Sequence, residues 1–349
     1  MLQEVLSDYN LIYDQLKFEP INNGLINKTW LVKNGRKNYI LQKVNHHIFK
    51  TPEAIASNVR KIADYLKLHY PQYLFVAPEK TIHNAEMKFI EGEGYYRLLA
   101  FVEDSKTINT VQNAVQAYEA AKKFGEFTVL LSDFPVDQLQ ITLPDFHDLS
   151  LRYKQYCNAL KNGNRERIKQ SATAISFIEK NKHIVQVYEQ ILKNNAFKIR
   201  VTHHDTKISN VLFSENDKGI CVIDLDTVMP GYFISDVGDM FRTYLSPANE
   251  EEKDFSKIEI REDYFKAIWN GYMSEMGKEL STEEKAHFIY AGKFMIYMQA
   301  IRFLTDHLNN DVYYGAAYPD HNFIRAGNQI TLLEKLIEKE TTLNKMIDL

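Results

Sequence analysis

The feature of the sequence that most constrains the fold is a change in hydrophobic pattern near residues 102–108. Upstream of it, short runs of β-branched and aromatic residues are separated by turn residues, which is typical of strands. Downstream of it, apolar residues recur every three or four positions, which is typical of helices. This order predicts an α+β fold with two lobes: a small antiparallel β-rich N-terminal lobe (residues 1–104) and a larger, mostly helical C-terminal lobe (residues 105–349).

Two antiparallel strand pairs are expected in the first lobe. Residues 26–33 and 37–45 flank Asn34-Gly35, which favours a two-residue hairpin because both positions tolerate positive φ. Residues 87–90 and 95–102 are expected to form the second pair, because they are rich in aromatic and aliphatic residues and flank a turn that contains glycine. The first lobe is therefore predicted to be a small sheet.

One helix is expected to interrupt these strands. Thr51 is a suitable cap, Pro52 suits the first turn, and the apolar stripe consists of Ile55, Val59, Ile62 and Leu66. In the second lobe, one helical face is predicted from Val111, Ala114, Val115, Tyr118 and Ala121. Long helices are predicted over residues 149–160, 172–194, 261–276 and 282–308. The only clear strand signal there is a short hairpin over residues 211–213 and 220–223.

The composition argues against several classes of protein. A formal net charge of −4, with basic residues spread along the chain, gives no concentrated basic surface for nucleic acid. Cys157 and Cys221 lack metal-ligand spacing and look like reduced cysteines. The first residues do not have the pattern of a signal peptide, and no apolar run is long enough to span a membrane. We expect a cytoplasmic protein, either a monomer or a weak dimer.

The residues that indicate chemistry lie on the predicted hairpin of the second lobe. His203-x-Asp205-x-x-x-x-Asn210 precedes its first strand, and Val222-Ile-Asp224-Leu-Asp226 ends its second. In phosphoryl transfer, one Asp accepts the proton of the acceptor hydroxyl, while an Asn and a second Asp hold Mg²⁺. A tight hairpin would bring Asn210 and Asp224 together at its open end. The alternative is that these residues only cap a turn and end a strand.

A nucleotide-binding role for the first lobe rests on fewer residues. The loop over residues 22–29, with Gly24, precedes a strand and is placed to cover phosphates, although a simple β-turn explains it equally well. Lys43, or Gln42 beside it, occupies the strand position of a phosphate-binding lysine. The strand register decides between them, because neighbouring side chains face opposite ways. Glu53 at the helix start is a candidate partner of that lysine, or favours the helix dipole alone.

The sequence resembles the aminoglycoside phosphotransferase and choline kinase superfamily, and within it the N-acetylhexosamine 1-kinases. The motifs that carry this resemblance are His203-x-Asp-Thr-Lys-x-x-Asn-Val, Cys221-Val-Ile-Asp-Leu-Asp-Thr-Val-Met-Pro-Gly231, Asp236-x-Gly-Asp-x-x-Arg242, Arg302-Phe-Leu-x-Asp306, Asp311-Val-Tyr-Tyr314 and Tyr318-Pro-x-His-Asn322. Upstream, Ile26-Asn27-x-Thr29, Tyr39-Ile-Leu-Gln42 and Phe146-His147 extend it over nearly the whole chain. The resemblance implies a protein-kinase-like two-lobed fold, with nucleotide bound by the first lobe and catalysis by the second.

The resemblance also implies roles for single residues. Asp205 would be the catalytic base, and Asn210 and Asp224 the magnesium ligands. The positions that would contact the sugar are Thr227, Arg302 and Tyr313, and the hinge that would meet adenine is Phe101-Val102-Glu103. Leu25 and Thr243 depart from the family pattern, where a His and an aromatic residue are found near the sugar.

The residues themselves leave alternatives open. Arg302 lies on an apolar helix, where it needs acceptors such as sugar hydroxyls, or pairs with Asp306 one turn on. Tyr313 suits a sugar-stacking loop, or only packs that loop. The expected activity is transfer of the γ-phosphate of ATP, with Mg²⁺, to the anomeric hydroxyl of an N-acetylhexosamine. The alternatives are another acceptor (aminoglycoside, amino alcohol or another sugar) and a nucleotide-binding scaffold without catalysis.

Overall fold

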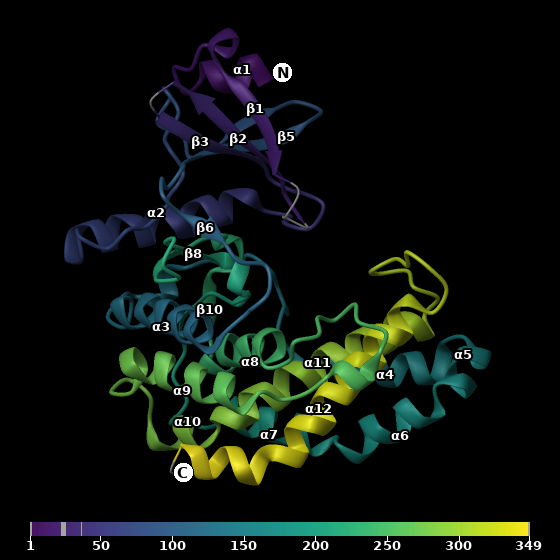
Figure 1. Ribbon diagram of the computed structural model, residues 1–349. Helices are drawn as coiled ribbons and strands as arrows, with labels where there is room; N and C mark the ends of the chain where they lie inside the picture. The colour runs from purple at the N-terminus through teal and green to yellow at the C-terminus, as the bar shows by residue number, and fades with distance from the viewer. Residues whose placement is uncertain (1, 22–25, 36, 348–349) are drawn as a thin grey trace.

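The computed structural model describes residues 2–21, 26–35 and 37–347, and has the expected α+β architecture with two lobes (Figure 1). The small lobe contains an antiparallel five-stranded sheet with the order β1-β2-β3-β5-β4. Its strands are β1 (Lys17–Ile21), β2 (Lys28–Asn34), β3 (Lys37–Lys43), β4 (Lys88–Ile90) and β5 (Gly94–Ala100). Both predicted strand pairs are confirmed, and Gly35 has the expected positive φ of 58° in the β2–β3 turn. The predicted lid residue Gly24 lies outside the described residues.

The two faces of the small sheet have different environments. One face packs on α1 (Leu2–Ser7) and the short helix η1 (Tyr13–Gln15), and its core includes Leu41, Tyr96 and Leu98. Side chains alternate along each strand, so the opposite face carries Gln42 and Arg97. That second face is directed to the large lobe, because Arg97 contacts a residue of the second lobe.

The helix α2 (Pro52–His69) confirms the predicted helix after Thr51, although the Thr51 side chain makes no capping hydrogen bond. All four residues of its predicted apolar stripe are buried, and they belong to the core of the large lobe. Asn58 adds polar contacts, donating to the carbonyl oxygens of Gln140 at 2.7 Å and Val228 at 3.1 Å. In Figure 1, α2 accordingly lies between the sheet and the large lobe.

The large lobe is mostly helical. Its helices are α3 (Ala114–Leu130), α4 (Leu149–Asn162), α5 (Arg165–Gln170), α6 (Ala172–Lys180), α7 (His183–Ile191), α8 (Phe233–Tyr244), α9 (Glu262–Met276), α10 (Thr282–Ala286), α11 (Phe288–Leu308) and α12 (His321–Met346), with short helices η2 (Val136–Gln138) and η5 (Phe255–Lys257). The buried helix α11 packs against α4, α8 and α12. Two expected long helices, over residues 172–194 and 282–308, are each broken in two. Between α6 and α7, the Asn181 side chain donates to the Phe177 carbonyl oxygen at 2.9 Å, a local bond that competes with helix continuation.

Two small sheets carry the loops of the large lobe. The predicted hairpin is confirmed as β8 (Val211–Phe213) and β9 (Gly219–Val222), which β6 (Lys106–Thr107) extends to three strands. An unpredicted pair, β7 (Arg200–Thr202) and β10 (Met229–Gly231), brackets the segment from His203 to Val228. Residues 101–105 connect β5 of the small lobe to β6 of the large lobe. No helix within the described ranges has both the length and the apolar character needed to cross a membrane.

Candidate active site

The segment that begins at His203 is held by a buried carboxylate. The Asp236 carboxylate, in the first turn of α8, accepts the backbone N–H of His203 at 3.1 Å and that of His204 at 2.7 Å. Thr206 adds a bond from its hydroxyl to the Asp236 carbonyl oxygen at 2.7 Å. Burial raises the pKa of Asp236 to about 7 even though the two backbone bonds act against that rise. Asp236 therefore serves to fix the loop.

The two histidines of the loop are structural. His203 is buried, its Nε2 lies 2.9 Å from the Ile223 carbonyl oxygen, and its ring meets the edge of Phe124 at 5.1 Å between centroids. Burial lowers the pKa of His203, and it lowers that of His204 to about 4. Both imidazoles are therefore neutral near pH 7, and they orient the loop without adding charge to it.

The three predicted catalytic and metal-binding residues are close together. Asn210 ends the short helix η3 (Ile208–Asn210), and its Nδ2 donates to the carbonyl oxygen of Asp205 at 2.8 Å and to Oδ2 of its side chain at 3.1 Å. The N–H of Ile223 donates to the Asn210 carbonyl oxygen at 2.8 Å, and Asp224 follows directly. The hairpin therefore brings Asn210 and Asp224 together at its open end. Lys207 completes the group, with its Nζ 3.2 Å from Oδ1 of Asp205.

Asp224 has an unusual backbone and electrostatic environment. It adopts the left-handed conformation, with φ 60° and ψ 62°, where the strand turns into the short helix η4 (Leu225–Thr227). The residue is exposed to solvent at the surface, although surrounding protein partly desolvates its carboxyl. This desolvation, with the nearby charges of Asp226 and Asp205, raises the pKa of its carboxyl to about 7. A bound cation would relieve this repulsion.

The donor set fits a hard cation. Within the described ranges, no group of three or more His, Cys, Asp and Glu residues is placed to hold a metal by itself. Asn210 uses its amide nitrogen on Asp205, so its amide oxygen can face a ligand, as can the Asp224 carboxylate. A carboxylate and an amide oxygen are the few protein ligands that Mg²⁺ takes when nucleotide phosphates and water supply the others. Asn210 and Asp224 are therefore the candidate metal ligands.

The strand register separates Gln42 from Lys43. Thr29, Gln42 and Arg97 are aligned across β2, β3 and β5, and Oε1 of Gln42 accepts a hydrogen bond from Arg97 Nε at 2.9 Å. Lys43 lies on the other face, where its Nζ contacts Glu93 at 2.5 Å and lies 5.6 Å from the Tyr96 ring centre. The structure thus places Gln42, but not Lys43, on the sheet face that meets the large lobe.

The predicted pair between Lys43 and Glu53 is wrong. Glu53 accepts a short hydrogen bond from the hydroxyl of Tyr95, and the nitrogen of Lys43 is engaged by Glu93. Glu53 and Lys43 both lie on predicted elements. Tyr95 binds Glu53 and Glu93 binds Lys43, so neither is left for the other. The glutamate at the start of α2 is therefore part of a contact between α2 and β5.

Asp226 links the two lobes. Its Oδ1 accepts a hydrogen bond from Arg97 Nη1 at 2.5 Å, and its Oδ2 accepts one from Asn27 Nδ2 at 2.8 Å. The Arg97 and Asp226 side chains are only 4% and 3% exposed. Sequence reasoning did not identify Arg97. Arg97 is the single charged residue in strand β5, which is the sequence feature that could have drawn attention to it. Its partner Asp226 could not be inferred without the strand register.

The predicted hinge residues lie on the connection between the lobes. The N–H of Phe101 donates to the Asn38 carbonyl oxygen at 3.2 Å, and the Asn38 side chain donates to Glu103 at 2.9 Å. The carbonyl oxygen of Val102 accepts the Ser105 hydroxyl at 2.6 Å. These bonds hold the connection against β3. Among the described residues, the backbone N–H groups of Val102 and Glu103 have no hydrogen-bond acceptor, so they are the candidate donors to adenine.

The predicted sugar-contacting residues are placed differently from one another. Thr227 is buried, and its hydroxyl donates to the His203 carbonyl oxygen at 2.6 Å. Arg302 on α11 has its guanidinium 6.0 Å from the Phe146 ring centre and 5.5 Å from that of Tyr314. Tyr313 is 72% exposed on the loop that follows α11.

The alternative salt bridge between Arg302 and Asp306 is not formed. The Asp306 carboxylate accepts the backbone N–H groups of Tyr313 at 2.7 Å and Tyr314 at 2.9 Å, so it shapes the tyrosine loop. The hydrogen bond of Arg302 goes to Gln299 at 3.2 Å. Arg152 lies nearby, and burial together with the charge of Arg302 lowers its pKa. Within the part of the chain that the structure describes, neither guanidinium has a carboxylate partner.

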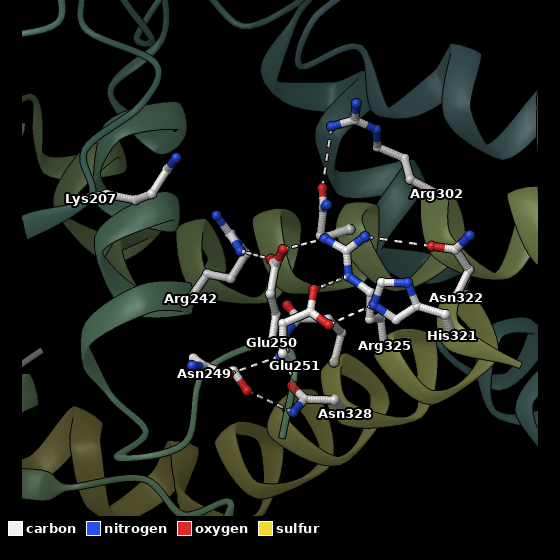
Figure 2. A network of polar contacts seen from close by, with 12 residues as sticks. Lys207, Arg242, Asn249, Glu250, Glu251, Arg302, His321, Asn322, Arg325 and Asn328 are labelled. Carbon is white, nitrogen blue, oxygen red and sulfur yellow. Dashed lines mark hydrogen bonds and ion pairs between the residues drawn. The ribbon is translucent and has the colours of Figure 1, made fainter. Parts of the chain in front are cut away.

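Ring contacts connect Arg302 to the loop of Asp205. Phe146, under Arg302, stacks on His147 at 4.3 Å, and the His147 ring lies 5.4 Å from that of His204. Figure 2 shows the other charged groups of this region, where Arg242 and Arg325 share Glu250 and where Arg325 and His321 contact Glu251. Arg242 also pairs with Asp239 at 2.9 Å.

A small antiparallel sheet set on a larger helical lobe, with a loop of Asp and Asn where they meet, is the protein-kinase-like fold, as expected. The sequence matches the model of the phosphotransferase enzyme family over residues 17–265, and the chain belongs to that family.

Solved structures share this fold over almost the whole chain. One is an aminoglycoside phosphotransferase from Alicyclobacillus acidocaldarius, with a TM-score of 0.68 and 13% identity, covering 99% of this chain and 96% of that one. A spectinomycin phosphotransferase in complex with ADP and spectinomycin has a TM-score of 0.59 and 11% identity, covering 93% of each chain. A choline kinase from Cryptosporidium parvum has a TM-score of 0.55 and 15% identity, covering 95% and 93%.

Proposed function

We propose that the protein is a small-molecule kinase that transfers the γ-phosphate of ATP to a hydroxyl group. The observation that carries this proposal is the proximity of Asp205, Asn210 and Asp224, which are the candidates for a base and two metal ligands. Membership of the phosphotransferase family and the ADP bound to a structure with the same fold support it. An arrangement that only capped a turn would not need an exposed Asp224 with a raised pKa.

In the proposed reaction, Asp205 orients the acceptor hydroxyl and takes its proton as the oxygen attacks the γ-phosphorus. Asn210 holds the Asp205 carboxylate through its amide, so that the second carboxylate oxygen is presented to the acceptor. Lys207 lies on that second oxygen and limits its movement. Asn210 and Asp224 would hold Mg²⁺, which would supply neutralisation of the phosphate charge. The backbone of residues 101–103 is the proposed contact for adenine.

We propose the anomeric hydroxyl of an N-acetylhexosamine as the acceptor. The family resemblance names Thr227, Arg302 and Tyr313 as sugar contacts, and the guanidinium and tyrosine loop are linked to the Asp205 loop through Phe146. Arg302 and Arg152 without carboxylate partners would repel a cationic acceptor, which disfavours aminoglycosides and amino alcohols. Guanidinium donors suit hydroxyl and carbonyl oxygens well.

Asp205→Asn tests the reaction. We expect kcat to fall by about 10²–10⁴-fold, because the base is lost, while the Kd for ADP changes less than about threefold. Asp133→Asn, at an exposed position remote from the loop, is the matched control. Turnover that stays the same in Asp205→Asn would overturn the assignment of the base.

A panel of acceptors with radiolabelled ATP tests the substrate. N-acetylglucosamine and N-acetylgalactosamine are expected to be labelled at the anomeric position, with choline and an aminoglycoside as cationic comparisons. Labelling of choline or the aminoglycoside instead would show that the acceptor is a cation, while the assignment of the protein as a kinase would stand. ADP binding without transfer to any compound would favour the scaffold without catalysis.

A further inference from the structure

A buried cation of the small lobe lies on the sheet face that meets the large lobe. Arg97 is aligned with Gln42, the residue beside the expected lysine, so the two side chains share one face. Its terminal nitrogen Nη1 reaches Asp226, two positions after the candidate metal ligand Asp224. The guanidinium is therefore next to the metal-binding end of the hairpin.

Arg97 retains donors that its partners do not use. A guanidinium has five N–H groups, and Arg97 uses Nε on Gln42 and Nη1 on Asp226. Among the residues that the structure describes, Nη2 has no hydrogen-bond acceptor. Burying a charge is costly unless it is paired, and one carboxylate with one amide oxygen leaves this guanidinium with unused capacity.

Lys43 cannot fill the same place in this conformation. It lies on the sheet face that carries the buried Tyr96, and Glu93 holds its ammonium group at 2.5 Å. The contact with Glu93 raises the pKa of Lys43, so the ammonium is stabilised where it is. To reach Asp224 it would have to leave both partners and cross the sheet.

We propose that Arg97, on β5, is the cation that contacts the nucleotide phosphates, and that Lys43 has no part in nucleotide binding. In this arrangement the cation is on β5 and not on the neighbouring strand β3. The β3 position is occupied by Gln42, whose side-chain amide oxygen accepts a hydrogen bond from the arginine. The ligand class is a nucleoside polyphosphate, whose oxygens accept from a planar guanidinium. This inference rests on the proposed function, because it assumes that ATP binds between the lobes.

A purely structural role for Arg97 is the competing explanation. Arg97 and Asn27 both bind Asp226, so the arginine would hold the lobes together and affect nucleotides only through that carboxylate. The two explanations differ once Asp226 is neutral. In an Asp226→Asn background, a structural arginine has lost its ionic partner, whereas a phosphate-binding arginine still has its ligand.

The experiment compares two variants: Asp226→Asn alone, and Asp226→Asn combined with Arg97→Gln. The probes are ADP with Mg²⁺ and adenosine, measured by calorimetry on the full chain, with the melting temperature recorded for each variant. We expect Arg97→Gln to weaken the binding of ADP about ten- to hundredfold and the binding of adenosine by less than about threefold. The difference reflects the loss of hydrogen bonds from a charged donor to the phosphates. Arg97→Lys should recover part of the ADP affinity.

Lys43→Gln in the otherwise unchanged chain is the matched control, since it removes one positive charge from the neighbouring strand. Its ADP affinity should stay within about twofold of the starting protein. Loss of ADP binding in Lys43→Gln, or ADP affinity that is insensitive to Arg97→Gln in the Asp226→Asn background, would overturn the inference. If the unchanged protein does not prefer ADP over adenosine, the proposed function fails. If the unchanged protein prefers ADP over adenosine but the Arg97 variants keep their ADP affinity, the inference about Arg97 is refuted and the proposed function stands.

Discussion

Arginine is used in opposite ways on the two sides of the Asp205 loop. On the small-lobe side, Arg97 is almost completely buried and has a carboxylate and an amide oxygen as partners. On the acceptor side, Arg302 lies against aromatic rings and has a glutamine as its hydrogen-bond partner. The paired, buried Arg97 fixes the relative position of the two lobes and has only its remaining donors for a ligand, while Arg302, without a carboxylate, keeps most of its donors for the acceptor. Substitution should therefore cost more stability at Arg97 than at Arg302, and affinity for the acceptor should depend on Arg302.

The largest expected effect is on stability, from Arg97→Met. Removing the arginine leaves the buried Asp226 carboxylate with Asn27 alone, and breaking a buried pair in this way costs about 3–5 kcal/mol. Urea unfolding of the protein without ligands measures it. Arg302→Met should cost less than about 1 kcal/mol, because no buried partner loses its counter-charge. Equal losses in the two variants would contradict the comparison.

A smaller effect, on the acceptor, is expected from Arg302→Gln. Losing the guanidinium should raise KM for the acceptor sugar about tenfold, which is the value of one or two hydrogen bonds to a charged donor. KM for ATP should stay within about twofold. Steady-state kinetics with each substrate varied in turn would show this. An increase in KM for ATP alone would place Arg302 on the nucleotide side.

The pH dependence of stability sharpens the description of the small-lobe side. The pKa of Asp224 is raised to about 7 in the folded chain, above the 3.8 of a free Asp, so the folded state binds the proton more tightly. This group therefore makes the protein more stable as the pH falls through 7, and less stable above it. With EDTA present, Asp224→Asn should raise the melting temperature more at about pH 8.5 than at about pH 5.5. An equal gain at both values would mean that Asp224 does not titrate there.

The smallest effect is expected from Tyr313→Ala. Because this side chain is 72% exposed, the free energy of unfolding should change by less than about 0.5 kcal/mol. If the ring stacks on the sugar, KM for the acceptor should rise a few-fold, and Tyr313→Phe should restore it. No change in KM with either variant would remove Tyr313 from the proposed acceptor site.

The arrangement of Asn210 and Asp224 could be predicted from the sequence because its geometry is local. Asn210 and Asp224 flank one hairpin, so joining its two strands is enough to bring them together. The same holds for the β2–β3 turn, where Asn34-Gly35 sets the pairing. Turn chemistry and hairpin pairing are encoded over short stretches of chain, and both predicted strand pairings were confirmed.

The remaining features depend on long-range register and on competition between partners. Nothing in a single strand tells which face meets the other lobe, so Gln42 and Lys43 could not be separated and Arg97 was not identified. The helix breaks near Asn181 and His287 were missed because apolar periodicity continues across them. Thr227 matches a sugar-contacting position, yet its hydroxyl is taken by a backbone carbonyl oxygen that only the folded loop presents.

The burial of α2 in the large-lobe core has a mechanical consequence. Its apolar stripe is part of that core, and Asn58 binds backbone groups of the large lobe, so α2 and the large lobe form one rigid block. Opening the protein to release nucleotide would then swing the five-stranded sheet against this block, and the contacts of Arg97 and Asn27 with Asp226 and of Tyr95 with Glu53 would have to release. A pair of spectroscopic labels on the sheet and α2 would report this swing, while a pair on α2 and α3 would remain silent.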